Sequence, residues 1–173
     1  MAAFENQSKE QGFEYERWQG IVVDQMPFFG ISVSHKAIVL DAKQKGLPMV
    51  CIAEDDCVFS SPGAWEYYLK SIPENFDLYF GLVYEGNIKD NKVLTGVLTG
   101  CLTLYIVHER FYDVFLSMKS MNNLDRELGK YAGDFDYKVC NPMVCFQSNG
   151  FSDHKKSEAT YDHLLVGRTL FGV

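Results

Sequence analysis

The sequence predicts an α/β domain built on a layered, largely parallel sheet, and three observations support this fold class. Apolar runs of strand length alternate along the chain with segments whose apolar residues recur at helical spacing. Apolar residues make up 47% of the 173 positions, which is enough to build a core. No linker, repeat or low-complexity segment divides the chain, so residues 1–173 are expected to form a single domain.

The first half of the chain predicts a polar start and one long helix. Residues 4–18 predict a polar helix or an irregular entry segment, and residues 21–23 predict a short strand. Ser34 is expected to cap a helix over 35–45, because serine side chains accept hydrogen bonds from the first free amides of a helix. Gly46 is expected to end that helix, because glycine readily adopts the left-handed conformation found at helix ends.

The rest of the chain continues the alternation of strands and helices. The predicted strands cover 47–53, 78–84, 99–107 and 139–147, and the predicted helices cover 61–71, 109–118 and 123–131. Ser61 followed by Pro62 favours a helix start, because proline is tolerated at the first helical position. A polar turn or loop is expected over 86–92, and an irregular tail is expected after Ser152.

Composition excludes several classes of protein. The formal net charge of −7 argues against nucleic acid as a partner, since phosphate backbones are bound by clustered lysine and arginine. The chain has neither the apolar segment of a signal peptide nor the run of roughly 18 apolar residues that a membrane helix needs. Five cysteines without a CxxC pair predict reduced thiols. We therefore expect a cytoplasmic protein without a transmembrane segment.

Three consecutive acids, Glu54, Asp55 and Asp56, follow the apolar run that predicts a buried strand over 47–53. Repulsion and desolvation make such a cluster unfavourable by several kcal/mol unless a positive charge lies beside it. Open α/β sheets place ligands at the carboxyl ends of strands, and carboxylate oxygens suit Mg²⁺ or Mn²⁺. The acids therefore predict a metal site that stabilises a phosphate leaving group. The alternative is a solvated acidic turn.

The segments at residues 30–35 and 46–59 resemble glycosyltransferase family 25, which includes lipooligosaccharide and collagen-type galactosyltransferases. The shared pattern is a Ser-His pair that opens a helix, and then a strand that ends in Glu-Asp-Asp and an apolar residue. Three later segments resemble further motifs in the family's order, at residues 99–107, 134–137 and 147–153. The resemblance spans about residues 13–156.

The resemblance implies a GT-A fold with helices on both faces of the sheet. It implies transfer of a sugar from a nucleotide-diphosphate donor, with a UDP-sugar as the leading candidate, to a glycan or glycoconjugate acceptor, as in lipopolysaccharide biosynthesis. Glu54 and Asp56 are then expected to hold Mn²⁺ or Mg²⁺ against the donor phosphates, and Asp55 to face the ribose or a backbone amide. His35 is expected to stabilise the start of its helix or to hydrogen-bond near the acidic loop.

Further site residues follow from the later motifs of the resemblance. Asp136, and after it Asp134, is the candidate general base that deprotonates the acceptor hydroxyl if the reaction inverts the anomeric centre. His154 is the candidate third metal ligand, with His163 as its alternative. Lys155 is a candidate for neutralising the diphosphate. For each of these residues a purely structural or surface role is the competing interpretation.

The resemblance also has a gap at the start of the chain. The family begins with an apolar strand, whereas this chain begins with polar residues. A sheet without that strand exposes an edge, which favours a homodimer. The chain is therefore expected to be a minimal enzyme, an N-terminally truncated domain, or a glycosyltransferase-like binding or assembly module with little or no activity. A magnesium-dependent phosphoryl-transfer enzyme outside this family is a separate possibility. It is disfavoured because no GxxxxGK[ST] loop is present.

Overall fold

The computed structural model describes residues 2–95, 100, 102–152 and 157–173. Its helices are α1 (Ala2–Gln11), α2 (Pro27–Gln44), α3 (Ala64–Lys70), α4 (Tyr112–Ser117) and α5 (Leu124–Gly129), with 3-10 turns η1 (Glu109–Phe111) and η2 (Asp162–Leu165). Its strands are β1 (Met49–Ala53), β2 (Cys57–Phe59), β3 (Leu78–Phe80), β4 (Asn87–Lys89), β5 (Lys92–Thr95), β6 (Leu104–His108), β7 (Tyr137–Val139), β8 (Cys145–Gln147), β9 (Gly150–Ser152) and β10 (Ser157–Ala159). No helix in the described part of the chain is long and apolar enough to cross a membrane.

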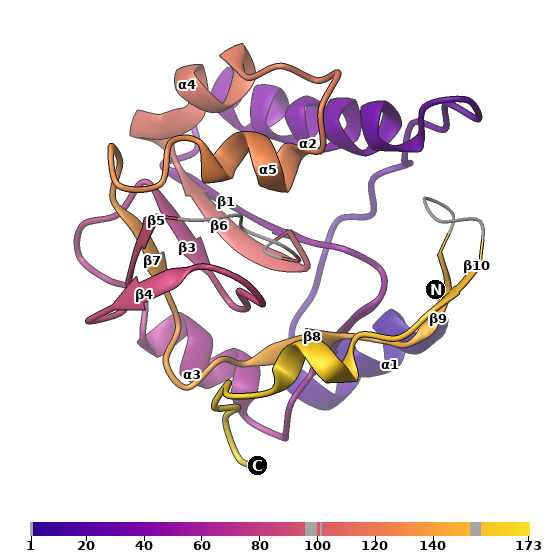
Figure 1. Cartoon of the computed structure of the whole chain (residues 1–173), viewed down its shortest axis with the longest axis vertical. Coiled ribbons are helices and arrows are strands. Elements are labelled where there is room, and N and C mark those ends of the chain that lie inside the picture. The colour runs from indigo at the N-terminus through magenta and orange to yellow at the C-terminus, as the bar shows by residue number, and fades with distance from the viewer. Residues whose placement is uncertain (1, 96–99, 101, 153–156) are drawn as a thin grey trace.

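The central sheet has six strands in the order β1-β6-β3-β7-β5-β4. Helices α2, α4 and α5 lie on one side of this sheet, and α1 and α3 lie on the other (Figure 1). The α/β class is therefore confirmed. Two small two-stranded sheets, β2 with β8 and β9 with β10, complete the strands of the described residues.

The expectation of a largely parallel sheet is wrong. Among the described strands of the central sheet, β3 and β7 pair in parallel and every other neighbouring pair is antiparallel. The reason is that β6 inserts between β1 and β3 and runs against both, while β5 lies antiparallel beside β7. Because β1, β3 and β7 still run in one direction, their carboxyl ends share one edge of the sheet and their amino ends share the other.

Strand β1 confirms the apolar run before the acids, but it is not a buried strand. It lies at the end of the strand order, and the described residues provide no strand beyond it. Ile52 is buried, whereas Met49, Cys51 and Ala53 are exposed. The position of β1 agrees with the exposed edge expected from the sequence, and the homodimer built on that edge stays a prediction.

Helix α2 begins eight residues before the predicted start, at Pro27, so Ser34 lies inside the helix and does not cap it. The Ser34 hydroxyl donates to the carbonyl of Gly30 at 2.8 Å and accepts the N–H of Ile21 at 2.7 Å. The strand predicted over 21–23 is absent from this segment, which runs close against α2 instead. Gly30 permits this approach, because a Cβ there would lie 2.2 Å from the Ile21 carbonyl oxygen.

Two other expectations are corrected in the second half of the chain. The strand predicted over 139–147 is two strands, β7 and β8, separated by the cis peptide bond before Pro142. The turn or loop predicted over 86–92 contains a turn at Asp90 and Asn91, with positive φ angles of 51° and 60°, but this turn joins strands β4 and β5 in a hairpin. These residue types tolerate the left-handed conformation that tight hairpins need.

The remaining predicted elements are confirmed with shorter boundaries. The helix expected over 61–71 is α3, which begins at Ala64 after Gly63, so Ser61 does not cap it. The helix expected over 109–118 is η1 followed by α4, and the one over 123–131 is α5. The strand expected over 99–107 is β6, and positions 99 and 101 of that prediction lie outside the described residues.

Aromatic side chains fill both faces of the sheet. On the face covered by α3, the Tyr68 ring stacks on Tyr79 with centroids 4.7 Å apart, and the Tyr68 hydroxyl donates to the Tyr79 carbonyl at 2.7 Å. On the opposite face, Tyr105 lies between Phe80 and Phe115 with centroid distances of 6.3 Å to each. These contacts fix β3 and β6, and thereby the sheet edge at which β1 ends.

Replacing Tyr68 by phenylalanine keeps the ring and removes the buried donor to the Tyr79 carbonyl. We expect Tyr68→Phe to lower the free energy of unfolding by about 1 kcal/mol, the usual net contribution of such a hydrogen bond. The control is Tyr15→Phe at a ring that is 41% exposed, where we expect a change within about 0.5 kcal/mol. Urea unfolding measures both values, and equal midpoints for the two variants would contradict this assignment.

Candidate functional site

The predicted acids lie on the turn between β1 and β2, at the carboxyl edge of the central sheet. Ala53 is the last residue of β1 and is paired with Leu104 of β6. The Glu54 N–H donates to the Thr103 carbonyl at 3.0 Å, and the Cys57 N–H donates back to the Glu54 carbonyl at 3.1 Å. The backbone of this turn is therefore held at both ends, which fixes where the carboxylates can lie.

Asp56 is hydrogen-bonded to Gln147 of β8 and to the residue after it, and one of its carboxylate oxygens takes no part in these bonds. Its Oδ2 accepts the Gln147 side-chain amide at 2.7 Å, and its carbonyl accepts the Ser148 N–H at 2.9 Å. Gln147 is itself fixed, because its N–H donates to the Tyr84 hydroxyl at 2.9 Å. The Oδ1 atom of Asp56 is buried and has no hydrogen-bond partner among the described residues. A buried oxygen without a partner is uncommon and favours a cation or a ligand at this point.

His35 lies behind Glu54 and not at the start of its helix. Its Nε2 is 3.7 Å from Glu54 Oε1, and its Nδ1 is 2.7 Å from the Tyr105 hydroxyl, on a ring stacked with its own. Burial lowers the pKa of His35 from 6.5 to about 4, so the ring is neutral at pH 7. His35 thus lies beside the acidic loop, but its hydrogen bond is to Tyr105 and not to the loop itself.

The carboxylates repel one another in this partly desolvated place. Burial first, and then the charges of Asp56, Asp125 and Asp55, raise the pKa of Glu54 from 4.5 to about 8. Burial also raises the pKa of Asp56, against the lowering effect of its hydrogen bond from Gln147. The site therefore does not accommodate all of its negative charges without a nearby positive charge.

Asp125 is the member of this acidic group that sequence reasoning missed. It lies in the first turn of α5, far along the chain from the acidic motif, yet it contributes to the raised pKa of Glu54. Acidic residues are common in the first turns of helices because they favour the positive end of the helix dipole. The sequence around Asp125 consequently carries no signal that separates it from an ordinary helix start.

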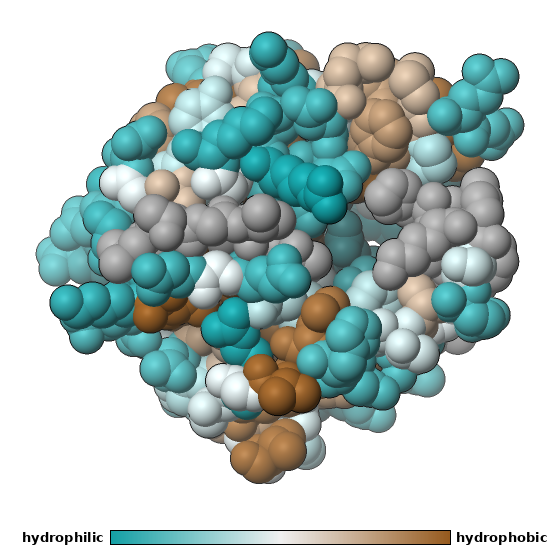
Figure 2. All heavy atoms as spheres, in the orientation of Figure 1, coloured by the Kyte–Doolittle hydropathy of each residue, from teal (hydrophilic) through white to brown (hydrophobic). Residues whose placement is uncertain are grey.

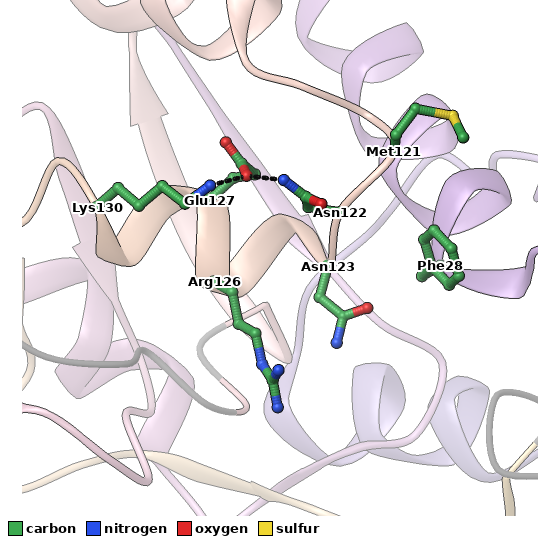
Figure 3. A pocket seen from close by; sticks show the side chains of 7 residues that line it. All are labelled: Phe28, Met121, Asn122, Asn123, Arg126, Glu127 and Lys130. Atoms are coloured by element: carbon green, nitrogen blue, oxygen red, sulfur yellow. Dashed lines mark hydrogen bonds and ion pairs between the residues drawn. The ribbon is translucent and has the colours of Figure 1, made fainter.

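Helix α5 also lines a surface cavity of about 350 Å³, together with the start of α2. Figure 2 shows hydrophilic side chains gathered over α5. The close view in Figure 3 shows Arg126 and Asn123 extending from the same side of α5, with Phe28 of α2 facing the loop before it. The charge of Asp125 on α5 thus acts on Glu54, and other residues of the same helix line this cavity.

Glu54 and Asp56 suit a divalent cation by their chemistry, since they offer hard carboxylate oxygens and one of these is buried without a partner. The described residues contain no group of three His, Cys, Asp or Glu side chains placed to hold a metal ion. The predicted third ligand His154 and the predicted diphosphate partner Lys155 lie outside the described residues. His163 is exposed on η2.

The candidate bases Asp134 and Asp136 are not brought to the acidic motif. Both precede β7, at the edge of the sheet where β1 begins and not where it ends. A five-residue strand separates the two edges by roughly 15 Å. A general base must lie within hydrogen-bond reach of the hydroxyl that it deprotonates. This placement does not support a catalytic role for either residue beside a cation at Glu54.

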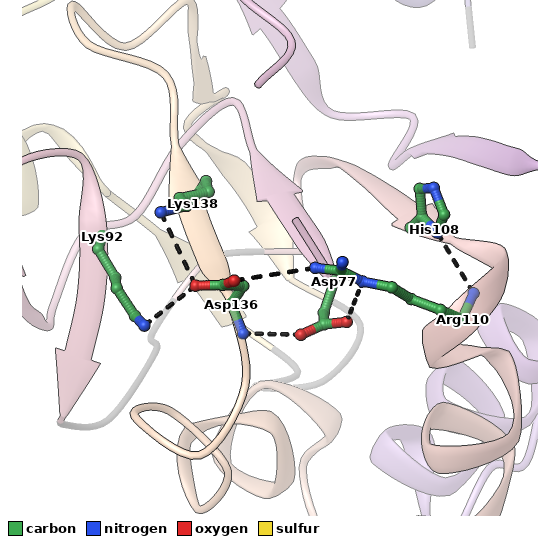
Figure 4. Close-up of polar contacts among 6 residues, drawn as sticks. All are labelled: Asp77, Lys92, His108, Arg110, Asp136 and Lys138. Atoms are coloured by element: carbon green, nitrogen blue, oxygen red, sulfur yellow. Dashed lines mark hydrogen bonds and ion pairs between the residues drawn. The ribbon is translucent and has the colours of Figure 1, made fainter. Parts of the chain in front are cut away.

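Asp136 instead belongs to a network of ion pairs that ties neighbouring strands together (Figure 4). Its carboxylate lies 3.0 Å from Lys92 Nζ, 3.8 Å from Lys138 Nζ and 3.9 Å from an Arg110 guanidinium nitrogen. The hydrogen bond from Lys92 is the main reason that its pKa is lowered. Asp77 completes the network, because it accepts the Asp136 N–H at 2.7 Å and Arg110 Nε at 2.6 Å.

No protein-family model and no curated protein matches this chain. The resemblance to glycosyltransferase family 25 therefore rests on the residues themselves, and the function of the acidic site is a matter for proposal.

The Asp77 network is expected to stabilise the fold and to take no part in ligand binding. Asp77→Ala removes two charge-assisted hydrogen bonds, so we expect the free energy of unfolding to fall by about 2 kcal/mol. Asp113→Ala is the matched control, since Asp113 is 81% exposed and its ion pair with Lys43 lies on the surface. Urea unfolding measures both. A loss in Asp77→Ala no larger than in the control would contradict the structural role.

The raised pKa of Glu54 predicts a dependence of stability on pH. The folded protein holds a proton on Glu54 up to about pH 8, which the unfolded chain releases near pH 4.5. Stability therefore falls as the pH rises through this window in the absence of divalent cations. His35 is neutral in the folded protein over this interval but loses its last protons in the unfolded chain just above pH 6.5, which opposes the effect of Glu54. Comparison of the wild type with Glu54→Gln therefore isolates Glu54.

We expect Glu54→Gln to lose this part of the slope and to be more stable than the wild type at pH 8. Thermal unfolding in EDTA between pH 6.5 and 8.5 measures the effect. Glu66→Gln, at an exposed carboxylate on α3, is the control and should keep the wild-type slope. Identical slopes for the wild type and Glu54→Gln would contradict the raised pKa.

Proposed function

We propose that this chain is a metal-dependent glycosyltransferase domain of GT-A type, which transfers a sugar from a nucleotide-diphosphate donor to a glycan or glycoconjugate. In this proposal Glu54 and Asp56 hold Mn²⁺ or Mg²⁺ against the donor diphosphate. The cation would stabilise the negative charge that develops on the departing nucleotide diphosphate.

One observation carries the proposal: three separate segments that resemble family 25 meet at one edge of the sheet. His35 from the first segment lies behind Glu54, and Gln147 from the last segment donates to Asp56. The buried Oδ1 of Asp56, without a hydrogen-bond partner among the described residues, supports a cation at this point in the proposal. An acidic turn without a ligand would not need side chains from two distant segments to orient its carboxylates.

The residues of the chain have distinct tasks in this proposal. Gln147 fixes one oxygen of Asp56 and leaves the other for the cation, and neutral His35 limits where Glu54 can move. Asp55 is exposed beside them. In the transfer itself, the acceptor oxygen bonds to the anomeric carbon, the bond from that carbon to the diphosphate breaks, and the hydroxyl proton passes to a base.

A second candidate function is a glycosyltransferase-like module that binds a nucleotide sugar without transferring it. The position of Asp134 and Asp136 at the opposite edge of the sheet favours this alternative, because it removes both bases that the sequence suggested. Asp125 belongs to another element and its charge acts on Glu54, so it is a candidate base if the chain is an enzyme.

Calorimetry with UDP-glucose, UDP-galactose, UDP-N-acetylglucosamine and GDP-mannose tests the proposal, with and without MnCl₂. We expect one of these donors to bind in a Mn²⁺-dependent manner. Asp56→Asn should weaken that binding at least tenfold, or about 1.4 kcal/mol, because the variant keeps the shape and loses the charge. Asp113→Asn, at an exposed carboxylate on α4, should bind as the wild type does.

A measurement of nucleotide diphosphate release separates the two candidates. Release in the presence of Mn²⁺ and donor supports the enzyme, whereas metal-dependent binding without release to water or to any acceptor supports the binding module. If no donor binds to the folded wild type, both candidates are wrong.

A further inference from the structure

The cavity beside α5 has the size and the chemistry of a small-molecule site. Its volume of about 350 Å³ lies within the range of ligand pockets, roughly 300–1,000 Å³. Phe28 and Met121 provide apolar surface, Asn122 and Asn123 provide amides, and Arg126 provides a guanidinium group. This combination of an aromatic face, amides and a cation suits a polyhydroxylated ligand with a negative charge.

The charges that line the cavity leave one cation unmatched. Glu127 is buried, and its Oε1 accepts both the Lys130 ammonium and the Asn122 amide, so these groups satisfy one another. The Arg126 guanidinium is not paired with a carboxylate of the described residues, and Figure 3 shows it extending away from the Glu127–Lys130 pair. Arg126 is exposed, so its guanidinium can reach a ligand in the cavity.

We propose that this cavity is the acceptor subsite and that it takes a carbohydrate carrying a carboxylate or phosphate group. The assignment of the acceptor role rests on the proposed transferase function. Arg126 would pair with the anionic group, for which its planar donors are suited in two parallel hydrogen bonds. Asn123 would hydrogen-bond to hydroxyl groups, and the Phe28 ring would pack on the apolar face of the sugar.

The position of the cavity suits the sugar acceptor better than the nucleotide-sugar donor. The donor diphosphate needs the cation at Glu54 and Asp56, whereas the cavity offers its own positive charge. The cavity lies between α5 and the start of α2, and α2 also carries His35, whose Nε2 is 3.7 Å from Glu54 Oε1. A sugar held by Arg126 would therefore lie beside the helix that reaches the acidic motif.

Titration by NMR in EDTA tests the subsite without any contribution from a divalent cation. The probes are D-glucuronate, α-D-glucose 1-phosphate and neutral D-glucose. We expect at least one of the two anionic sugars to bind at least fivefold more tightly than glucose and to shift the side-chain amide signals of Asn123. Comparison of the two anionic probes identifies whether carboxylate or phosphate is preferred.

Arg126→Gln should weaken binding of the preferred anionic sugar at least fivefold and leave the response to glucose unchanged. Arg17→Gln is the matched control, since Arg17 is exposed in the segment before α2 and does not line the cavity. Equal binding of charged and neutral sugars, no binding of either anionic sugar, or an unchanged affinity in Arg126→Gln would overturn the proposal.

Asp56→Asn separates this inference from the proposed function. The variant should lose Mn²⁺-dependent donor binding and keep the binding of the anionic sugar in EDTA. If the wild type binds the anionic sugar through Arg126 but binds no nucleotide sugar, the acceptor role is overturned together with the proposed function. If the wild type binds a nucleotide sugar with Mn²⁺ and no anionic sugar, the subsite is overturned while the transferase proposal stands.

Discussion

The site depends on one electrostatic constraint, namely that β1 leads directly into carboxylates that are partly removed from water. The pKa of Glu54 is raised to about 8, and one buried carboxylate oxygen of Asp56 has no hydrogen-bond partner among the described residues. Neighbouring elements orient these groups without neutralising them: His35 is itself neutral, and Gln147 is an amide. A cation would relieve this repulsion and would use oxygens that are already held in place.

The acidic side chains at the two edges of the central sheet have different surroundings. At the amino edge, Asp77 and Asp136 are surrounded by Lys92, Lys138 and Arg110, so the charges compensate one another and join the strands. At the carboxyl edge, Glu54 has neutral His35 beside it and Asp56 accepts the Gln147 side-chain amide. Compensated charge serves the stability of the fold, whereas uncompensated charge is what a ligand can use. This difference is the reason that we propose the ligand site at the carboxyl edge.

Local features of the chain could be predicted from sequence, and long-range ones could not. The apolar run before Glu54 and the helix after Pro62 follow from composition and turn chemistry, which act over a few residues. The direction of β6 depends on its pairing with the distant strands β1 and β3, and it cannot be predicted from the residues of β6 alone. Asp136 was misplaced for this reason, because its location depends on which edge of the sheet the start of β7 occupies. Asp125 was missed because its role arises from the packing of α5 near Glu54.

The central claim is that a divalent cation binds at the carboxyl edge, and paramagnetic broadening by Mn²⁺ tests it most directly. Substoichiometric Mn²⁺ should be added to the ¹⁵N-labelled protein with UDP present. The account predicts that the amide signals of Glu54, Asp56 and Gln147 broaden first, while those of Lys92 and Asp136 at the opposite edge persist. Broadening centred on Asp136, or no site-specific broadening at all, would contradict the account.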